Sequence, residues 1–375
     1  MKGLKIIVLI CFVLFVLMIV DVIFGFIMFK NDSPYKYIQK HFQSSNPQPL
    51  YVAQPFLNYI NNPDYINESG QKQINAWGLR HNRDIKLPKP SNIIRILFLG
   101  GSTTFGEVEK TENTFSAILE KRLNSSISQI SSPHKTIECI NAGLGAATSA
   151  ELLIHYLLKY KYLQPDVVVI HAGINDAFAT VSLEDYVYQP DYHTSKAIFK
   201  NPMPVNRFIR FLSFSNIFTF AIVKTLYREY LKNSFTENPF FTYHDKHIWY
   251  PNGNEEKFKT SANGYYNNIS ELVNILKNHG KKVLLVTEVV DTFHMPIEYK
   301  IKLSEGIELN NQFTIRIGME KSVPVCVLPK SNFGHNLFIT NDGIHVNEKG
   351  ELTKAELIET YLLKILLEHL AYAQN

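Results

Sequence analysis

Five short apolar runs separated by helix-like segments constrain the fold of this chain more than any other feature. The runs fall at about residues 93–99, 136–141, 166–171, 282–288 and 324–328. Amphipathic patterns of helical length lie between several of them, for example at 115–123 and 151–158. Parallel strands that are buried on both faces read as continuous apolar runs. The alternation therefore predicts an α/β domain with a mostly parallel five-stranded sheet covered by helices on both faces.

The first of these runs ends in a candidate nucleophile. It leads directly into Gly100-Gly101-Ser102. A serine at this point lies at the carboxyl edge of the sheet, where open α/β folds bind their ligands. Glycine and serine are also common turn residues, so the motif alone fits an ordinary turn equally well.

A second candidate motif, Asp342-Gly343-Ile344-His345, lies near the carboxyl terminus. An aspartate three residues before a histidine can orient the imidazole, which can then take a proton from a serine. Such a pair also arises by chance as a capped turn with a surface histidine. Alone, it does not distinguish these interpretations.

The third apolar run is followed by Gly173-Ile174-Asn175-Asp176. The Asn175 amide can donate hydrogen bonds to an oxyanion, and the Asp176 carboxylate can cap the following segment. Turn chemistry explains either residue by itself. The occurrence of three such motifs in one chain favours a shared site.

Together these motifs resemble those of the SGNH hydrolases, also called GDSL-type esterases. The matching segments are Gly100–Thr104, Asn141–Ser149, Gly173–Asp176 and Asp342–His345, in the order of the family, within about residues 91–350. The resemblance implies a three-layer α/β/α domain of flavodoxin-like type. It also implies hydrolysis or transfer of an acyl ester, with Ser102, Asp342 and His345 as the catalytic residues. The Gly-x-Ser-x-Gly elbow of α/β-hydrolases fits less well, because Thr104 replaces its last glycine.

The chain departs from the family pattern at two positions. Gly101 stands where the namesake motif has aspartate, a variation that leaves the serine geometry possible. Ala146 stands where the family has its oxyanion glycine, with Gly145 one residue earlier. The chemistry needs a main-chain N–H, which alanine also has, and only a positive φ would disfavour alanine. The expected oxyanion hole comprises the Ser102 N–H, an N–H of the Gly145/Ala146 region and the Asn175 side chain.

Composition argues against several classes of function. The chain of 375 residues carries 38 basic and 34 acidic side chains, a net charge of +4, without a basic cluster. We therefore expect no nucleic-acid partner. The histidines lack ligand spacing such as His-Glu-x-x-His, so we expect no metal and no cofactor. Cys139 and Cys326 fall in predicted strands and Cys11 in an apolar run, where buried free thiols are usual.

A membrane anchor is predicted at residues 6–29, after a tail at 1–5. The 24 residues contain one charged side chain, Asp21, which we interpret as a packing or interface feature. A helix of this length rises about 36 Å and can cross a hydrocarbon core of about 30 Å. The run is long for a cleaved signal peptide and lacks a small-residue cleavage site, which favours an uncleaved signal anchor. A cleaved signal peptide and a buried core helix remain the alternatives.

The remainder divides into a lead-in, a domain and an insertion. Residues 30–90, rich in Asn, Gln, Pro and Tyr, are predicted to form a tether and domain lead-in. Residues 91–372 are predicted to form the hydrolase-like domain. Its unusually aromatic segment at about 183–260 is expected to be a lid or binding wall. Arg80 in the lead-in is expected either near the substrate cleft or in a surface strap packed by Trp77.

The expected function is hydrolysis of an ester bond of an O-acylated carbohydrate or a related envelope ester. Lysines flank the apolar run on both sides and give no orientation, so only the long carboxyl-terminal domain and the expected substrate favour a place outside the cytoplasm. Two alternatives stay open. An O-acyltransferase would use the same residues with another acceptor. A non-catalytic polymer-binding or assembly protein would use the same fold, and Ala146 is the best argument for it.

Overall fold

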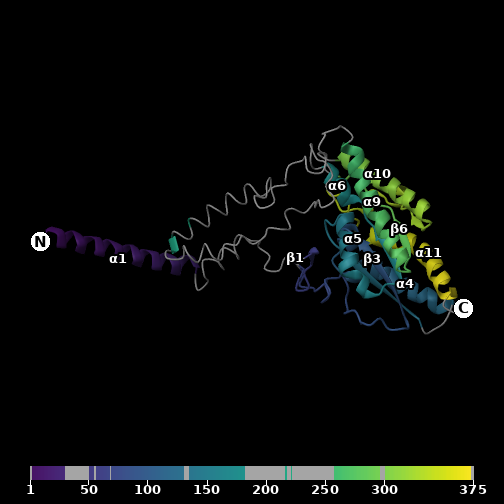
Figure 1. The fold of residues 1–375 in the computed structure, drawn as a ribbon, viewed down its shortest axis with the longest axis horizontal. Coiled ribbons are helices and arrows are strands. Elements are labelled where there is room, and N and C mark those ends of the chain that lie inside the picture. The colour runs from purple at the N-terminus through teal and green to yellow at the C-terminus, as the bar shows by residue number, and fades with distance from the viewer. Residues whose placement is uncertain are drawn as a thin grey trace. The chain divides into compact units, whose positions relative to one another are not determined.

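The computed structural model describes residues 2–29, 50–54, 56–67, 69–130, 135–181, 216–217, 221, 257–295 and 300–372 (Figure 1). The chain divides into two compact units, one of residues 1–49 with 196–245 and the other of residues 50–195 with 246–375. Of the predicted tether and domain lead-in at 30–90, residues 30–49, 55 and 68 lie outside the described residues. So does the predicted aromatic insertion at 183–260, except for residues 216–217, 221 and 257–260.

The first unit contains α1 (Lys2–Phe29), an uninterrupted helix of apolar residues. Its segment Val8–Ile27 is long and apolar enough to cross a membrane, a test that a signal sequence also passes. The Asp21 carboxylate accepts hydrogen bonds from the backbone N–H groups of Asn216 (2.8 Å) and Ile217 (2.9 Å). Asp21 is therefore paired with backbone donors, in agreement with its interpretation as a packing residue.

The second unit is built on the predicted parallel sheet, with strand order β4-β3-β5-β6-β7. The strands are β3 (Ile93–Gly100), β4 (Thr136–Gly143), β5 (Val167–His171), β6 (Lys282–Val286) and β7 (Val325–Cys326). The last two are shorter than their apolar runs predict. Beyond Val286 and Cys326 side-chain contacts replace the strand ladder, since the Leu328 N–H donates to the Thr287 hydroxyl (2.9 Å).

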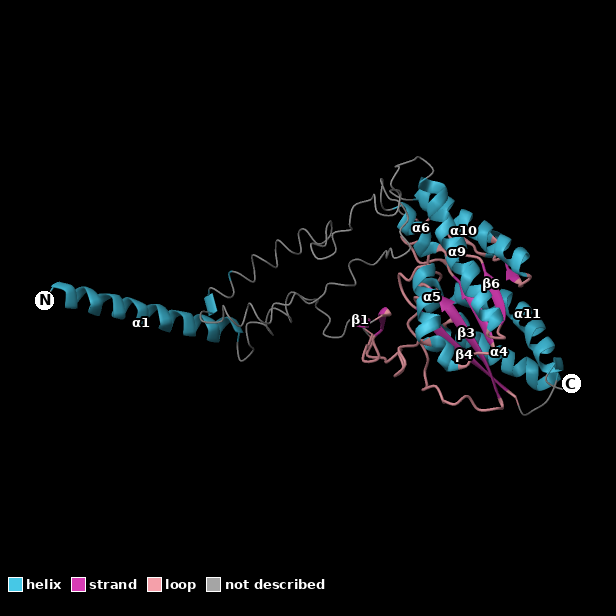
Figure 2. Ribbon diagram, viewed as in Figure 1, coloured by secondary structure: helices cyan, strands magenta, loops and turns pink. Residues whose placement is uncertain are grey.

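Helices cover both faces of this sheet, as Figure 2 shows. The helices α4 (Phe115–Ile130) and α11 (Glu348–Tyr372) pack on one face, in a core cluster that includes Phe98, Val169, Phe115 and Leu362. The opposite face carries α5 (Ser149–Leu158), α9 (Lys257–Asn278) and α10 (Lys300–Lys321). The predicted three-layer α/β/α architecture is confirmed. Cys139 and Cys326 are buried free thiols.

The strand order places the carboxyl ends of β3, β4 and β5 side by side. Strand order reverses at β3, which lies between β4 and β5, and open α/β sheets bind ligands outside such a switch point. Shorter elements surround this edge of the sheet: β1 (Tyr51–Gln54), β2 (Asn58–Asn61), α3 (Ser102–Phe105), η1 (Thr111–Asn113), α6 (Ile174–Val181), η3 (Lys330–Asn332) and η4 (His335–Leu337). The short helix η2 (Tyr160–Leu163) precedes β5 at the opposite edge. Residues that follow these three strands are thereby brought together.

Candidate active site

The structure brings Ser102, His345 and Asp342 into one hydrogen-bonded chain. Ser102 is the first residue of α3, directly beyond β3. Its Oγ lies 2.7 Å from Nε2 of His345, and Nδ1 of His345 lies 2.8 Å from Oδ2 of Asp342. With the proton on Nδ1, Nε2 can accept the Ser102 hydroxyl proton. A hydroxyl, a base and an orienting carboxylate therefore meet at the carboxyl edge of the sheet.

Local hydrogen bonds make Asp342 and His345 one compact loop. The Oδ1 atom of Asp342 accepts the backbone N–H groups of Ile344 and His345, both at 2.6 Å. The other oxygen is thereby directed at the imidazole. The sequence spacing of three residues is what allows one carboxylate to bind both the backbone and the ring of His345.

The two ionisable groups stabilise each other's charged form. Burial alone would lower the pKa of His345, but its hydrogen bond and charge interaction with Asp342 outweigh burial and raise that pKa above 6.5. Burial alone would raise the pKa of Asp342, but the hydrogen bond and charge of His345 outweigh it and lower that pKa below 3.8. Asp342 is therefore ionised at neutral pH, and His345 titrates above its ordinary range.

The Asn175 amide lies directly beside the Ser102 turn. A Cβ at Gly101 would lie 2.4 Å from Nδ2 of Asn175, so only glycine allows this approach without displacing the amide. Nδ2 also donates to the carbonyl of Ala147 (2.9 Å), which fixes its position and leaves its second proton for another acceptor. The Asn175 amide therefore lies against the turn that carries Ser102, the first residue of α3.

The loop after β4 has the backbone conformation that disfavours alanine. Ala146 has φ +61°, whereas its neighbour Gly145 is not among the residues with positive φ. A Cβ at Gly145 would lie 1.9 Å from the Tyr51 hydroxyl, so Gly145 is needed for close packing instead. Tyr59 of β2 donates its hydroxyl to the Gly145 carbonyl (2.8 Å). The hairpin of the lead-in thus holds this loop, with Ala146 in a left-handed conformation.

Arg80 supports the backbone behind the nucleophile. Arg80 is 2% exposed, and its guanidinium donates to the carbonyls of Phe105, the last residue of α3, and of Gly106 and Val108. The guanidinium also lies 4.5 Å from the ring centroid of Phe105. The expectation of a surface strap is wrong, because Arg80 is buried where the lead-in packs into the second unit. Its two terminal nitrogens donate to backbone carbonyls at the end of α3 and just after it, whereas Nε is buried without a hydrogen-bond partner among the described residues.

Buried charged groups hold Thr103, the residue after Ser102. The Thr103 hydroxyl donates to Oε1 of Glu288 (2.9 Å), and Nζ of Lys354 donates to the Thr103 carbonyl (2.8 Å). Nε2 of His171 lies 2.9 Å from Oε2 of Glu288, at ion-pair distance but without a straight hydrogen bond. Lys354 is also paired with Glu351 (2.9 Å). Burial opposes ionisation of Glu288, but His171, Lys354 and Thr103 outweigh it and lower its pKa.

Asp176 has a structural place rather than one beside Ser102. Its carboxylate accepts the backbone N–H and the hydroxyl of Ser149, the latter at 2.6 Å, at the start of α5. It therefore binds the start of an earlier helix, α5, and it also accepts its own backbone N–H in the first turn of α6. Burial raises the pKa of Asp176 to about 6.

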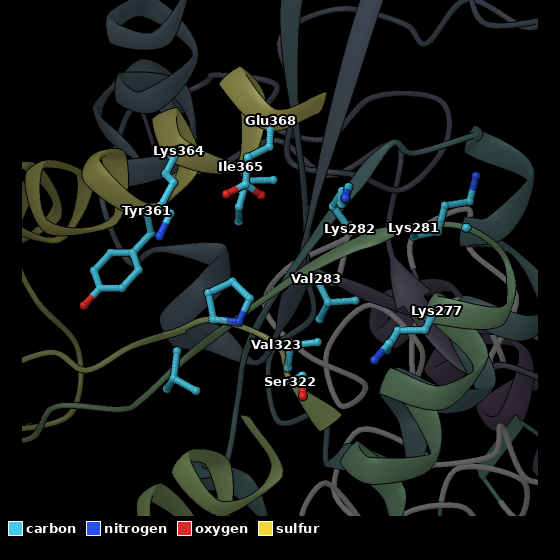
Figure 3. A pocket seen from close by; sticks show the side chains of 13 residues that line it. Lys277, Lys281, Lys282, Val283, Ser322, Val323, Tyr361, Lys364, Ile365 and Glu368 are labelled. Carbon is cyan, nitrogen blue, oxygen red and sulfur yellow. The ribbon is translucent and has the colours of Figure 1, made fainter. Parts of the chain in front are cut away.

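A cavity lies at the end of the sheet opposite to the edge that carries Ser102. It has a volume of about 600 Å³ and opens at the amino ends of β6 and β7. Figure 3 shows the lysines around it, Lys277, Lys281, Lys282 and Lys364. None of the predicted site residues lines this cavity, so it is separate from the cluster around Ser102.

Comparisons with known structures give distant similarities. The chain is similar to a lipase/acylhydrolase from Enterococcus faecalis, with 16% identity over 72% of this chain and 95% of that one, and a TM-score of 0.42. It is also similar to the acetyl xylan esterase AlAXEase, with 15% identity over 72% and 99% of the two chains and a TM-score of 0.42. A two-domain esterase active on acetylated mannans is 16% identical over 73% of this chain and 50% of that one, with a TM-score of 0.40. No curated protein sequence matches the chain.

The family comparison covers the part of the chain that holds the cluster. The profile of the GDSL-like lipase/acylhydrolase family matches residues 98–351, which is more than half of the chain. Ser102, Asn175, Asp342 and His345 all lie within this range. The resemblance predicted from the sequence motifs is confirmed. The chain belongs to the GDSL-like lipase/acylhydrolase family, and it is an ester-hydrolysing enzyme.

Proposed function

We propose that this enzyme cleaves an O-acyl ester with Ser102 as nucleophile, His345 as general base and Asp342 as the carboxylate that orients His345. The observation that carries the proposal is the continuous hydrogen-bonded chain from Ser102 Oγ through the imidazole to Asp342. The lowered pKa of Asp342 supports the same roles, because an ionised carboxylate holds the Nδ1 proton in place.

The reaction follows in two halves. Ser102 Oγ attacks the ester carbonyl carbon while its proton passes to Nε2 of His345, and the resulting imidazolium is stabilised by Asp342. His345 then protonates the departing alkoxide, which leaves an acyl group on Ser102. Water attacks this acyl-enzyme and gives its proton to His345. The acid is released and Ser102 recovers its proton.

The oxyanion of each tetrahedral intermediate needs hydrogen-bond donors that are already in position. We assign this role to the Ser102 N–H, the Asn175 side chain and a main-chain N–H of the Gly145/Ala146 region. The contact of Nδ2 with Ala147 supports the assignment for Asn175, because it holds the amide beside Gly101.

For the substrate we propose an O-acylated carbohydrate outside the cytoplasm, with α1 as a membrane anchor. The segment at 183–260 contains many aromatic residues, whose flat apolar faces suit sugar rings. The length and apolar character of Val8–Ile27 support the anchor. A cysteine introduced at the exposed Lys349 would test the orientation, since a membrane-impermeant thiol reagent labels it in intact cells only if the domain lies outside.

The experiment that tests the nucleophile uses the full chain in detergent. Hydrolysis of an aryl acetate and labelling by a fluorophosphonate are compared for wild type, Ser102→Ala and the exposed control Ser125→Ala. We expect Ser102→Ala to lose labelling and about 10⁴-fold or more in kcat, and the control to keep both. Retained turnover in Ser102→Ala would remove Ser102 from the mechanism. A folded wild type with neither turnover nor labelling would contradict the proposed nucleophile.

The substrate class requires a separate comparison. Acetylated oligosaccharides and long-chain acyl esters are offered to the wild type, and released acid is measured with and without added sugar acceptors. We expect acetate release from the oligosaccharide to exceed release of the long-chain acid. Acyl transfer to the acceptor in place of acid release would identify a transferase.

A further inference from the structure

Three side chains with metal-binding donor atoms converge next to the loop of Asp342 and His345. Asp291 and His294 belong to the segment after β6, and His335 is the first residue of η4. Nδ1 of His294 lies 2.7 Å from Oδ2 of Asp291, and Nδ1 of His335 lies 2.8 Å from Oδ1 of the same carboxylate. One donor atom of each residue lies within 4.8 Å of the others.

The donor set suits a borderline divalent cation. One carboxylate and two imidazoles form a three-ligand set of the kind that binds Zn²⁺ and leaves a fourth position for water. Imidazole nitrogens favour Zn²⁺, Cu²⁺ or Ni²⁺ over Mg²⁺ and Ca²⁺, which prefer sites made only of oxygen. Donors around a tetrahedral Zn²⁺ at about 2.0–2.1 Å lie about 3.4 Å apart. The contacts of His294 and His335 with the Asp291 carboxylate, at 2.7 and 2.8 Å, widen by about 0.6–0.7 Å to admit the ion, and the other donor pairs, which lie within 4.8 Å, adjust to the same spacing.

Cation binding requires a free lone pair on Nδ1 of each imidazole. Each imidazole now donates its Nδ1 proton to Asp291, which leaves Nε2 without a proton in the neutral ring. When Nδ1 binds a cation, that proton moves to Nε2, which faces away from the carboxylate contact. The neutral rings thus become ligands by a change of tautomer.

Neighbouring groups hold the donors in place. The ring centroid of Phe293 lies 4.7 Å from that of His335 and 5.0 Å from that of His294, so one aromatic side chain contacts both imidazoles. The Phe293 N–H donates to Oδ1 of Asp291 (2.9 Å). The Asp291 side chain is 7% exposed, whereas that of His335 is 66% exposed. The cluster is therefore anchored on a buried carboxylate and open to solvent on the side of His335.

The cluster is joined directly to the Asp342 loop. The Asp291 N–H donates to the carbonyl of Gly343 (2.7 Å), the residue that follows Asp342. Gly343 has φ +72°, and a Cβ there would lie 2.3 Å from the Asp291 carbonyl oxygen, so the two backbones are in contact. Whatever fixes Asp291 therefore restrains the loop that carries Asp342 and His345.

We propose that Asp291, His294 and His335 bind one zinc-class divalent cation and that the bound ion stiffens the Asp342–His345 loop. The cation is a structural clamp and takes no part in the ester chemistry. Sequence spacing does not reveal such a site, because His335 lies 41 residues after His294. Cation binding is independent of the proposed function. Only the effect of a stiffer loop on catalysis rests on the proposed function.

The test uses the tag-free full chain in detergent, stripped with a chelator and titrated with Co²⁺ and then Zn²⁺. We expect one equivalent of Co²⁺ to give visible tetrahedral d–d absorption and Zn²⁺ to displace it. His294→Asn and His335→Asn should each weaken Zn²⁺ binding about 100-fold or more, whereas His369→Asn on α11 should leave it unchanged. Circular dichroism of each chelated variant shows whether it remains folded.

Two results would overturn the proposal. The site is refuted if the wild type binds no more Zn²⁺ than the folded Asp291→Asn/His294→Asn/His335→Asn variant. The clamp is refuted if Zn²⁺ binds but hydrogen exchange of the amides at 342–346 is not slowed in the wild type. Neither measurement uses ester turnover, so the outcome is distinguishable from failure of Ser102 as nucleophile.

Discussion

The two sides of the Ser102–His345 contact are held in different ways. The turn of Ser102 is supported by buried groups from the lead-in, from the segment after β6 and from α11, which include Arg80, Glu288 and Lys354. The loop of Asp342 and His345 lies nearer the surface, with these two side chains 28% and 19% exposed. It is held by its own carboxylate, by backbone hydrogen bonds with Ile339 and by the backbone contact to Asp291, and none of these contacts is a buried ion pair.

The difference separates folding from chemistry. Buried ion pairs are costly to break, so substitutions behind Ser102 should act first on the stability of the domain. Groups in a half-exposed loop contribute less to stability, so substitutions there should act first on turnover. Experiments that measure both the free energy of unfolding and turnover test whether the two sides differ in this way.

The largest effect is expected on the loop side, for Asp342→Asn. The amide oxygen of the new asparagine can still accept the backbone N–H groups of Ile344 and His345. Its NH₂ group then faces Nδ1 of His345. The imidazole proton then moves to Nε2, which can no longer accept the proton of Ser102. We expect kcat to fall about 10⁴-fold, or about 5.4 kcal/mol in the barrier, with the free energy of unfolding changed by less than about 1 kcal/mol.

Ester turnover and denaturant unfolding of the same preparation measure these two quantities. The exposed Glu308→Gln variant is the control for loss of a carboxylate, and it should match the wild type in both. An Asp342→Asn enzyme that unfolds as readily as it loses activity would contradict the separation.

On the nucleophile side, Lys354→Met should cost about 3–5 kcal/mol in the free energy of unfolding. The substitution leaves Glu351 buried without its cation and removes the donor to the Thr103 carbonyl. Lys349→Met, at an exposed position of the same helix, is the matched control and should change stability by less than about 0.5 kcal/mol. Equal, small losses in both variants would show that the buried charges do not support the Ser102 turn.

The sequence predicted the loop side of the site better than the support of the nucleophile. Asp342 and His345 are three residues apart, so their relation is visible in a linear motif. Ser102 and Asn175 each follow an apolar run, and parallel strands bring such positions to one edge of a sheet. The five strands were predictable for the same reason, because burial on both faces leaves a continuous apolar run.

The supporting groups could not be predicted because their partners are distant in sequence. Thr103 meets Glu288 185 residues away and Lys354 251 residues away. A lysine on a helix usually faces water, and only the packed fold reveals that Lys354 does not. The positive φ of Ala146 likewise depends on how the hairpin of Tyr59 packs against its loop. The sequence offered one signal for buried supporting groups, which is a single polar residue at the end of an apolar run, as at Asn141 and Glu288.

The pH dependence of kcat/KM should report on His345, on the loop side of the site. His345 must be neutral to take the Ser102 proton, so kcat/KM should rise with pH and have its midpoint above 6.5, since the His345 pKa is raised by Asp342. On the acid limb kcat/KM should change about tenfold per pH unit. In Asp342→Asn the midpoint should move to lower pH. An acid limb centred below 6.5 in the wild type would contradict the assignment of His345.

The stabilisation from His345 should fall as pH rises, whereas kcat/KM rises with pH. The raised pKa of His345 means that its pair with Asp342 stabilises the fold fully below pH 6.5 and that this contribution is lost as pH rises through the folded pKa. The lowered pKa of Asp342 means that the contribution is present above pH 3.8 and is lost as pH falls through its folded pKa. The pair therefore stabilises the protein most between these limits, where His345 is protonated and turnover is low.

The smallest effect is expected from Ala146→Gly, which tests where backbone strain lies. The loop side fills its left-handed positions with Asn341 (φ +63°) and Gly343 (φ +72°), residue types that tolerate this conformation. The nucleophile side places Ala146 (φ +61°) in the same region, where a Cβ is unfavourable. Glycine relieves this cost but makes the unfolded chain more flexible, so we expect a net gain of about 0.5–1 kcal/mol in the free energy of unfolding.

Denaturant unfolding of Ala146→Gly and of the control Ala355→Gly, in the interior of α11, measures this difference. The control should lose stability, because glycine costs about 1 kcal/mol in a helix without any strain to relieve. Turnover of Ala146→Gly should stay within about threefold of the wild type, since both residues offer the same main-chain N–H. A loss of stability in both variants would mean that the loop after β4 carries no strain at Ala146, and that the two sides differ only in their buried charges.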